Sequence, residues 1–210
     1  MTSQASAAAT LSPIVPAPSF GSEPLARTLI EAYLAVRGET ERRAAPLSPE
    51  DQVVQSMPDA SPAKWHRAHT TWFFEQFLLT EHCTGYQPFH PDYAFLFNSY
   101  YVSAGPRHTR GERGLITRPG AEEISAYRRH VDVAMVGFLS GADASVLSAV
   151  APLVEVGLNH EQQHQELMLT DILHAFAQNP VAPAYDSNWR FPSPSASGEA
   201  WVMLPEGIHT

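Results

Sequence analysis

Apolar residues recur at intervals of three and four positions in four segments of the chain, the pattern of helices that bury one face. The spacing predicts a helix from Pro24 that ends before Gly38 or frays beyond it, and helices over residues 61–82, 120–139 and 144–176. No alternating pattern typical of a β-strand competes with them in this part of the chain. We therefore predict an all-α fold, a four-helix bundle with one long loop between its second and third helices.

Two serine–proline pairs mark predicted helix starts. Serine is a favoured N-cap residue, and proline is well suited to the first helical position. Ser61-Pro62 is predicted to start the second long helix, and Ser48-Pro49 a short helical turn before it.

Residues 84–119 form the predicted crossing loop, which is rich in proline and glycine. Its aromatic residues need burial, so we predict an ordered loop: Tyr93, Phe95, Phe97, Tyr100 and Tyr101. Loops of this length in compact domains are usually functional.

Composition divides the chain on either side of the helices. Residues 1–22 are rich in Ala, Ser, Thr and Pro, and are predicted to be a disordered leader. The helical domain is predicted over residues 23–180, followed by a linker over residues 181–199. Residues 200–210 have the pattern of a strand and turn with nothing to pair with, which predicts the truncated start of a second domain.

Charge and cysteine content exclude several classes of protein. The formal net charge is -9, which suits a nucleic-acid backbone poorly because such binding depends on clustered Lys and Arg. The single cysteine, Cys83, cannot form an internal disulfide. The start of the chain lacks the basic segment of a secretory signal, and no apolar run reaches the roughly 18 residues of a membrane-spanning helix. We predict a cytoplasmic protein that binds neither nucleic acid nor membrane.

The most informative motif is His160-Glu161-Gln162-Gln163-His164, inside the fourth predicted helix. Histidines four positions apart lie on one face, one turn apart, so their imidazoles can bind one ion. They share a helical stripe with three apolar residues, which predicts that the pair points into the bundle: Leu153, Val156 and Leu167. The alternative is a pair of core or surface histidines without a metal.

The same five residues satisfy the H-E-x-x-H pattern of zinc peptidases, in which the glutamate is the general base. The extended form of that pattern fails, because Leu167 and Asp171 stand where glycine and a third histidine are required. No glutamate lies between Glu166 and Glu199 to serve as a distal ligand. A zinc peptidase is therefore a weak alternative.

A third ligand is predicted from the second helix. Trp65, Trp72 and Phe73 flank His69 on the helical wheel, so His69 faces the core. His66 lies about 60° away and is predicted to support the site from outside the ligand set or to reach the surface. The alternative for His69 is a core histidine that packs among aromatic residues.

Three histidines leave coordination positions open for water, substrate or O₂, which favours catalysis over a structural role. They also suit zinc, copper or nickel as well as iron. Arg107, Arg110 and Arg113 in the long loop are candidates to bind a substrate carboxylate, although a solvated loop is an equal alternative. His174 lies about 15 Å beyond His164 along the helix and cannot share the ion.

Four segments together resemble the amino-terminal DinB-like domain of the EgtB family of ergothioneine biosynthesis, which are non-haem iron(II) sulfoxide synthases. The segments are Trp-His-Arg-Ala-His-Thr-Thr-Trp-Phe-Phe-Glu at 65–75, Phe-Asn-Ser-Tyr-Tyr at 97–101, Gly-Pro-Arg-His at 105–108 and His-Glu-Gln-Gln-His-Gln-Glu at 160–166. The resemblance covers roughly residues 24–180.

The resemblance implies a DinB-like bundle that holds Fe(II) with His69, His160 and His164. It places Gln163 near the histidine-derived substrate. Residues 201–208 resemble the opening strand of the second domain of the family, which is like the formylglycine-generating enzyme. The catalytic tyrosine of the family belongs to that domain, so catalysis requires a part that this chain lacks or that a second chain supplies.

By resemblance, the full enzyme uses O₂ to join cysteine or γ-glutamylcysteine to hercynine, the Nα-trimethyl derivative of histidine, and forms a sulfoxide. An open site suits this reaction because the reactants can be held together. Two alternatives remain: a DinB-like thiol transferase that uses zinc or nickel without O₂, and a non-catalytic metal-binding fragment or subunit.

Overall fold

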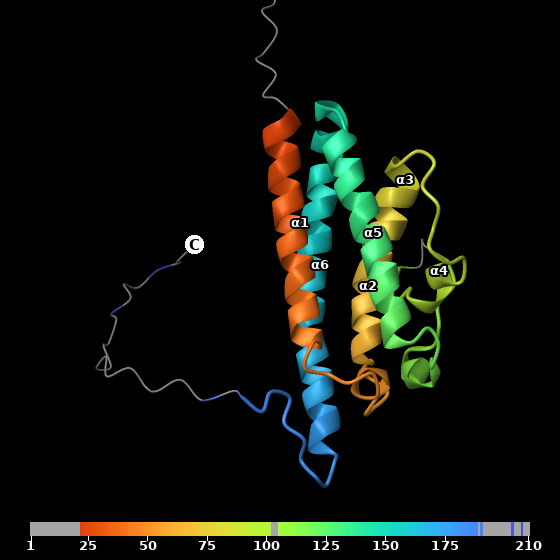
Figure 1. Ribbon diagram of the computed structural model, residues 1–210, viewed down its shortest axis with the longest axis vertical. Helices are drawn as coiled ribbons and strands as arrows, with labels where there is room; N and C mark the ends of the chain where they lie inside the picture. The colour runs from red at the N-terminus through yellow and green to blue at the C-terminus, as the bar shows by residue number, and fades with distance from the viewer. Residues whose placement is uncertain (1–21, 102–104, 189, 191–202, 204–206, 208–210) are drawn as a thin grey trace, which may run out of the picture.

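The computed structural model describes residues 22–101, 105–188, 190, 203 and 207. Within these residues the chain forms helices and no strand, so the predicted all-α class is confirmed. The long helices are α1 (Ser22–Ala44), α2 (Ala63–Phe74), α5 (Ala121–Gly141) and α6 (Ala144–Ala177). They lie side by side, with α1 and α2 each packed against both α5 and α6 (Figure 1).

The second predicted helix is continuous but changes its winding. After α2 the chain makes a π-helical turn at Glu75–Leu79 and then the short α3 (Thr80–His82). The Thr80 hydroxyl donates to the Glu75 carbonyl across this turn. π-Helical turns within α-helices often lie beside functional sites, and this one follows two turns after His69.

The first helix extends beyond its predicted end at Gly38. A glycine in a helix costs about 1 kcal/mol relative to alanine, so the sequence favours an end there. Arg37 and Thr40 are buried, and both donate hydrogen bonds to Glu161 of α6. Tertiary contacts on either side of Gly38 therefore continue the helix to Ala44.

The predicted helix starts lie within one or two residues of the observed ones. Pro62 is the N-cap of α2, one position after the predicted cap, and the Ser61 amide donates to Asp171 instead. Ser48 and Asp51 exchange hydrogen bonds between amide and side chain, which starts a short 3₁₀ turn at Asp51–Val53.

A close approach between α2 and α6 brings the histidines of the two helices together. A Cβ atom at Gly157 would lie 2.6 Å from Cε1 of Phe74, so this contact excludes larger side chains. His160 lies about one turn after Gly157 and is thereby held against α2. The buried core around this contact is aromatic and includes Trp65, Trp72 and Tyr33.

The crossing loop contains the short helix α4 (Tyr93–Leu96) and a 3₁₀ segment at Arg110–Leu115. Tyr93 and Phe97 are buried, as predicted. Phe95 and Tyr100 are 41% and 65% exposed, so the prediction that all five aromatic residues are buried was wrong for these two. Phe95 packs on His108 and Tyr100 lies beside two arginines, contacts that the sequence pattern does not reveal.

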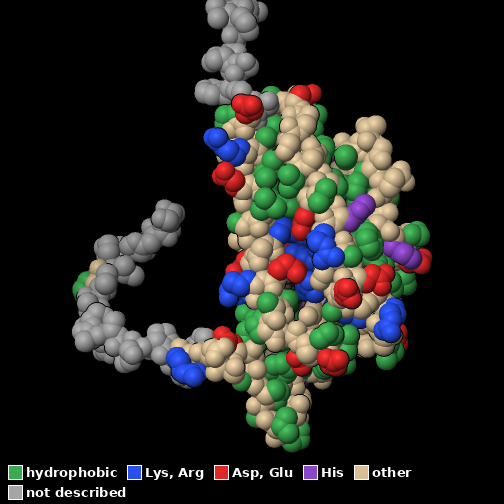
Figure 2. All heavy atoms as spheres, in the orientation of Figure 1, with side chains coloured by type: hydrophobic (Ala, Val, Ile, Leu, Met, Phe, Trp, Pro, Cys, Tyr) green, Lys and Arg blue, Asp and Glu red, His purple; other side chains and the backbone are tan. Residues whose placement is uncertain are grey.

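Charged side chains of both signs gather midway along the face that α1 and α5 present (Figure 2). Beneath them, Arg37 of α1 pairs with Asp132 of α5 and Glu161 of α6. None of the described helices combines the length and the apolar character that crossing a membrane requires. The predicted leader, the last part of the predicted linker and the predicted second-domain start lie almost wholly outside the described residues.

Candidate metal centre

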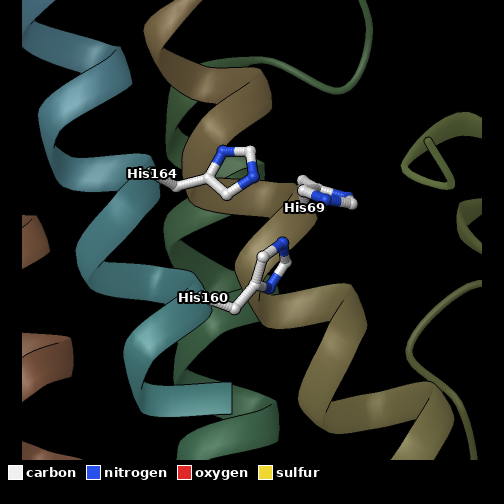
Figure 3. Close-up of side chains that lie close together, drawn as sticks. All are labelled: His69, His160 and His164. Atoms are coloured by element: carbon white, nitrogen blue, oxygen red, sulfur yellow. The ribbon is translucent and has the colours of Figure 1, made fainter. Parts of the chain in front are cut away.

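Three imidazoles from two helices converge on one point. His69 belongs to α2, and His160 and His164 lie one turn apart on α6. One ring nitrogen of each histidine lies within 4.8 Å of those of the other two. The rings point toward a common space between the helices (Figure 3). This is the set that the spacing predicted, and its geometry can hold a metal ion.

His69 is fixed on both faces and at one nitrogen. Trp65 and Trp72 stack on its ring with centroid distances of 4.6 and 5.5 Å. Its Nδ1 lies 2.5 Å from the carbonyl oxygen of Phe97 in the crossing loop. A carbonyl only accepts, so Nδ1 carries the proton and Nε2 keeps a lone pair for an ion.

His164 is held through His66, which is fully buried. The Nδ1 atoms of His164 and His66 are 2.8 Å apart, and Nε2 of His66 lies 2.9 Å from Oδ2 of Asp171. The prediction that His66 supports the site without joining the ligand set agrees with this contact. The alternative of a surface position for His66 was wrong, because α6 covers it.

His160 tests whether the cluster fits an ion. Its Nδ1 is buried and makes no hydrogen bond with any residue that the structure describes. Its ring packs against Phe73 with a centroid distance of 5.0 Å. No hydrogen bond commits its nitrogens, so the ring is free to bond an ion.

Burial keeps the three imidazoles neutral. It lowers the pKa of His160 to about 4, and it lowers the pKa of His69 and His164 as well, with the neighbouring imidazoles adding to the effect for these two. Neutral imidazole is the form that binds a metal. The cluster therefore holds three lone-pair donors at neutral pH.

The histidine pair lies at the edge of the core rather than in its centre. Val156 and Leu167, which share its stripe, are 54% and 39% exposed, so the prediction that this stripe points into the bundle was wrong for these two residues. Leu153 packs against the core, and the two histidine rings face His69 of α2. The buried face of α6 includes Val154, Glu161 and Met168 instead. The shift gives the imidazoles access to a cleft.

The cleft has a volume of about 430 Å³, within the range of small-molecule sites. Besides the histidines, its lining includes Tyr100, Tyr101, Gln163 and Asp171. Tyr101 packs near both His69 and His160, with ring centroids 6.3 and 6.1 Å away. Burial raises the pKa of its phenol, so Tyr101 is uncharged at neutral pH.

The loop arginines occupy different positions around this cleft. Arg110 and Arg113 line it, whereas Arg107 lines an adjoining pocket. Arg113 is buried, donates to the hydroxyls of Ser61 and Ser99, and lies 3.4 Å from the ring centre of Trp65.

Burial lowers the pKa of Arg113 to about 10, which still leaves it cationic at neutral pH. Among the described residues, no carboxylate is within ion-pair distance of any of the three loop arginines. The cleft therefore has positive charge available for an anionic ligand.

Glu161 takes no part in the metal centre. Its carboxylate is fully buried and binds Arg37, Arg128 and Thr40 at distances of 2.7–2.9 Å. The general base of a zinc peptidase must reach water at the metal, and these contacts hold Glu161 away from it. The geometry argues against the peptidase alternative.

Two residues of the site were not predicted from the sequence, Asp171 and Tyr101. Asp171 follows His164 by seven residues, a spacing that places both on one helix face and could have indicated a contact. Tyr101 was predicted only to be a buried loop residue, and nothing in its spacing relates it to the histidines. Its contact with them depends on how the loop folds.

In comparisons with known proteins, no protein-family model matches the chain, and no curated protein matches it.

Proposed function

We propose that this chain is the metal-binding domain of an iron(II)- and O₂-dependent sulfoxide synthase similar to the EgtB family. The full enzyme joins hercynine to cysteine or γ-glutamylcysteine in ergothioneine biosynthesis. The motifs that resemble the family include all three clustered histidines, and the proposal depends on that coincidence.

The observation that carries the proposal is the set of three neutral imidazoles beside a cleft. Structural zinc sites are usually closed and contain cysteine, whereas three histidines leave positions open. Cys83, the only cysteine, does not line the cleft. A substrate of the size of hercynine fits a cleft of about 430 Å³.

His69, His160 and His164 would hold Fe(II), which when bound supplies O₂ activation and coordination of the thiolate. Trp65 and Trp72 keep the plane of His69 fixed and exclude water from its faces. Such rigidity holds the reactants in a productive arrangement.

The cleft residues fit the charges of the proposed substrates. Arg110 and Arg113 bind a carboxylate, since guanidinium groups form paired, charge-assisted hydrogen bonds. The aromatic face of Tyr101 suits the trimethylammonium group of hercynine, whereas the ring of Tyr100 already has the guanidinium groups of Arg107 and Arg110 beside it. Gln163, which lines the cleft on the exposed side of α6, hydrogen-bonds the imidazole of the substrate. Arg107 is less well placed, because it lines the adjoining pocket.

The test is metal content and ligand response of protein purified without oxygen. We expect one equivalent of iron, a change in its spectrum on addition of hercynine, and loss of both in His164→Ala. His174→Ala is the matched control, because His174 lies on the same helix and bonds Ser56 instead of an ion. A chain that binds no stoichiometric metal would contradict the proposal.

The same experiment distinguishes a thiol transferase, which also suits three imidazoles. Zinc or nickel in the purified protein, with no response to hercynine and no O₂ consumption with a thiol, would favour the transferase. Iron without a hercynine response would indicate a metal-binding subunit that depends on another chain.

A further inference from the structure

A chain of hydrogen bonds leads from the candidate metal centre into the junction between α2 and α6. His164 contacts His66 through their Nδ1 atoms, and His66 contacts Oδ2 of Asp171 through Nε2. Asp171 follows His164 by about two helical turns on the same face of α6, and His66 precedes His69 by one turn of α2. The three groups therefore connect the two helices at the centre.

The position of each proton along these hydrogen bonds follows from the chemistry of the Asp171 carboxylate at one end. An ionised carboxylate only accepts hydrogen bonds, so Nε2 of His66 carries a proton. Burial lowers the pKa of His66, and the neutral ring has a lone pair on Nδ1. The proton between the two Nδ1 atoms must belong to His164, which leaves Nε2 of His164 unprotonated on the side of the metal centre.

The carboxylate itself is fixed. Oδ2 of Asp171 accepts from the amide of Ser61 at 2.8 Å as well as from His66 at 2.9 Å. The Ser61 amide precedes α2, so the backbone orients the acceptor independently of the imidazoles. His66 is buried against Trp65, with a centroid distance of 5.9 Å, and has little freedom to rotate.

We propose that Asp171 and His66 are positioning residues that select the Nδ1-protonated tautomer of His164 and thereby keep its Nε2 available to the metal. The inference depends on the proposed function only for the three-histidine metal site, not for iron or hercynine. The carbonyl of Phe97 has the same effect on His69, while Nδ1 of His160 has no such partner among the described residues.

Metal affinity is the first test, with Co(II) as the probe and calorimetry or chelator competition as the measurement. Outer contacts of this kind typically change metal affinity by about 10- to 100-fold. We expect a loss in this range for His66→Phe and for Asp171→Ala. Asp171→Asn keeps an oxygen for His66 and Ser61, so it should restore much of the affinity. His174→Phe is the control and should bind as the native chain does.

The second test observes the tautomers directly, by nitrogen-15 NMR of the histidine rings in the metal-free chain. We expect His164 protonated at Nδ1 and His66 at Nε2 in the native chain and in Asp171→Asn. In His66→Phe, the spectrum should show His164 with its proton at Nε2 or exchanging between nitrogens. A role in packing alone would lower thermal stability without changing the tautomer of His164.

The outcomes separate this inference from the proposed function. If the native chain binds no Co(II), the three-histidine site itself is wrong, whatever the tautomers are. If it binds Co(II) and both His66→Phe and Asp171→Ala bind equally well while folded, the positioning role is wrong and the metal site stands. A native His164 protonated at Nε2 would also overturn it.

Discussion

The two sides of the His160–His164 turn of α6 differ in how their polar groups are satisfied. On one side, Glu161 is buried and both of its carboxylate oxygens accept from Arg37, Arg128 or Thr40. On the other side, the histidines keep ring nitrogens that no described residue binds, and they face a cleft. One motif thus contributes to a closed ionic network and to an open donor cluster.

The difference distinguishes a side whose polar groups are paired within the protein from a side that could hold a metal ion. Buried polar groups are normally hydrogen-bonded, so a side whose groups are all paired needs no ligand. Buried imidazole nitrogens without hydrogen-bond partners raise the free energy of the folded chain, and a metal ion bound to their lone pairs can remove this cost. We therefore expect substitutions on the Glu161 side to change stability, and substitutions on the histidine side to change metal binding.

We expect the largest loss in the free energy of unfolding for Glu161→Ala. Removing the carboxylate breaks the buried ion pairs of Glu161 with Arg37 and Arg128, which keep only Asp132 and Glu41 as carboxylate partners. Breaking a buried ion pair by removing one partner costs about 3–5 kcal/mol. The measurement is the free energy of unfolding in urea, with Glu155→Ala, an exposed glutamate of α6, as control. A loss no larger than that of the control would show that the network is not structural.

Acid should weaken the same network. Burial alone would raise the pKa of Glu161, but Arg37, Arg128 and Thr40 outweigh it and lower the pKa to about 2 from the ordinary 4.5. Because the folded-state pKa is the lower one, the stabilisation is present above pH 4.5 and is lost as pH falls toward 2. The shift corresponds to about 3 kcal/mol.

The free energy of unfolding as a function of pH measures this loss. Glu161→Gln should show a correspondingly flatter decline between pH 4.5 and 2. If the native chain and this variant have parallel pH profiles, other carboxylates carry the acid sensitivity.

On the histidine side, metal should stabilise the native chain but not His160→Ala. Binding at 100 times the dissociation constant adds about 2.7 kcal/mol to the free energy of unfolding. The metal-free stability of His160→Ala should change less than that of Glu161→Ala, since His160 makes no hydrogen bond with the described residues. Equal metal stabilisation in both chains would remove His160 from the ligand set.

Arg113 tests the charge of the cleft. Arg113→Met keeps much of the packing on Trp65 but removes the guanidinium, so hercynine should bind the iron-loaded chain about tenfold more weakly, or about 1.4 kcal/mol. The hercynine concentration that gives half the spectral change measures this. Arg129→Met, at an exposed position of α5, is the control. Unchanged binding would remove Arg113 from the substrate site.

The sequence was sufficient for the long helices and for the choice of the three histidines, because both depend on local spacing. The contact of His69 with the pair depends on the packing of α2 against α6. Histidines four residues apart must share a face, and the wheel of α2 places His69 in the core. The sequence did not show how far the histidine face of α6 turns toward the core. That depends on the neighbouring helices, which bury Val154 and Glu161 and leave Val156 exposed. The extension of α1 past Gly38 likewise depends on contacts between α1 and α6, which are distant in sequence.

The partners of polar groups were the least predictable part of the site. Asp171 and His66 are 105 positions apart in the chain, and no local pattern pairs them. The contacts of Arg113 with Ser61 and Ser99 depend on the path of the crossing loop. The sequence predicted which atoms could bind a metal ion. Only the structure shows which of these atoms already have hydrogen-bond partners.

We expect the smallest loss of stability for a substitution of Glu39, whose ion pairs differ from those of Glu161 mainly in burial. Hydrogen bonds from Arg42 and Arg43 lower the pKa of Glu39 to about 2, as low as that of Glu161. The Glu39 side chain is nevertheless 31% exposed, so water screens its pairs and would solvate the arginines left behind. Glu39→Gln should therefore cost less than about 1 kcal/mol, and added salt should reduce even that. Urea unfolding of Glu39→Gln beside Glu161→Gln measures the contrast. Equal losses would mean that charge pairing alone, rather than burial, makes the Glu161 side structural.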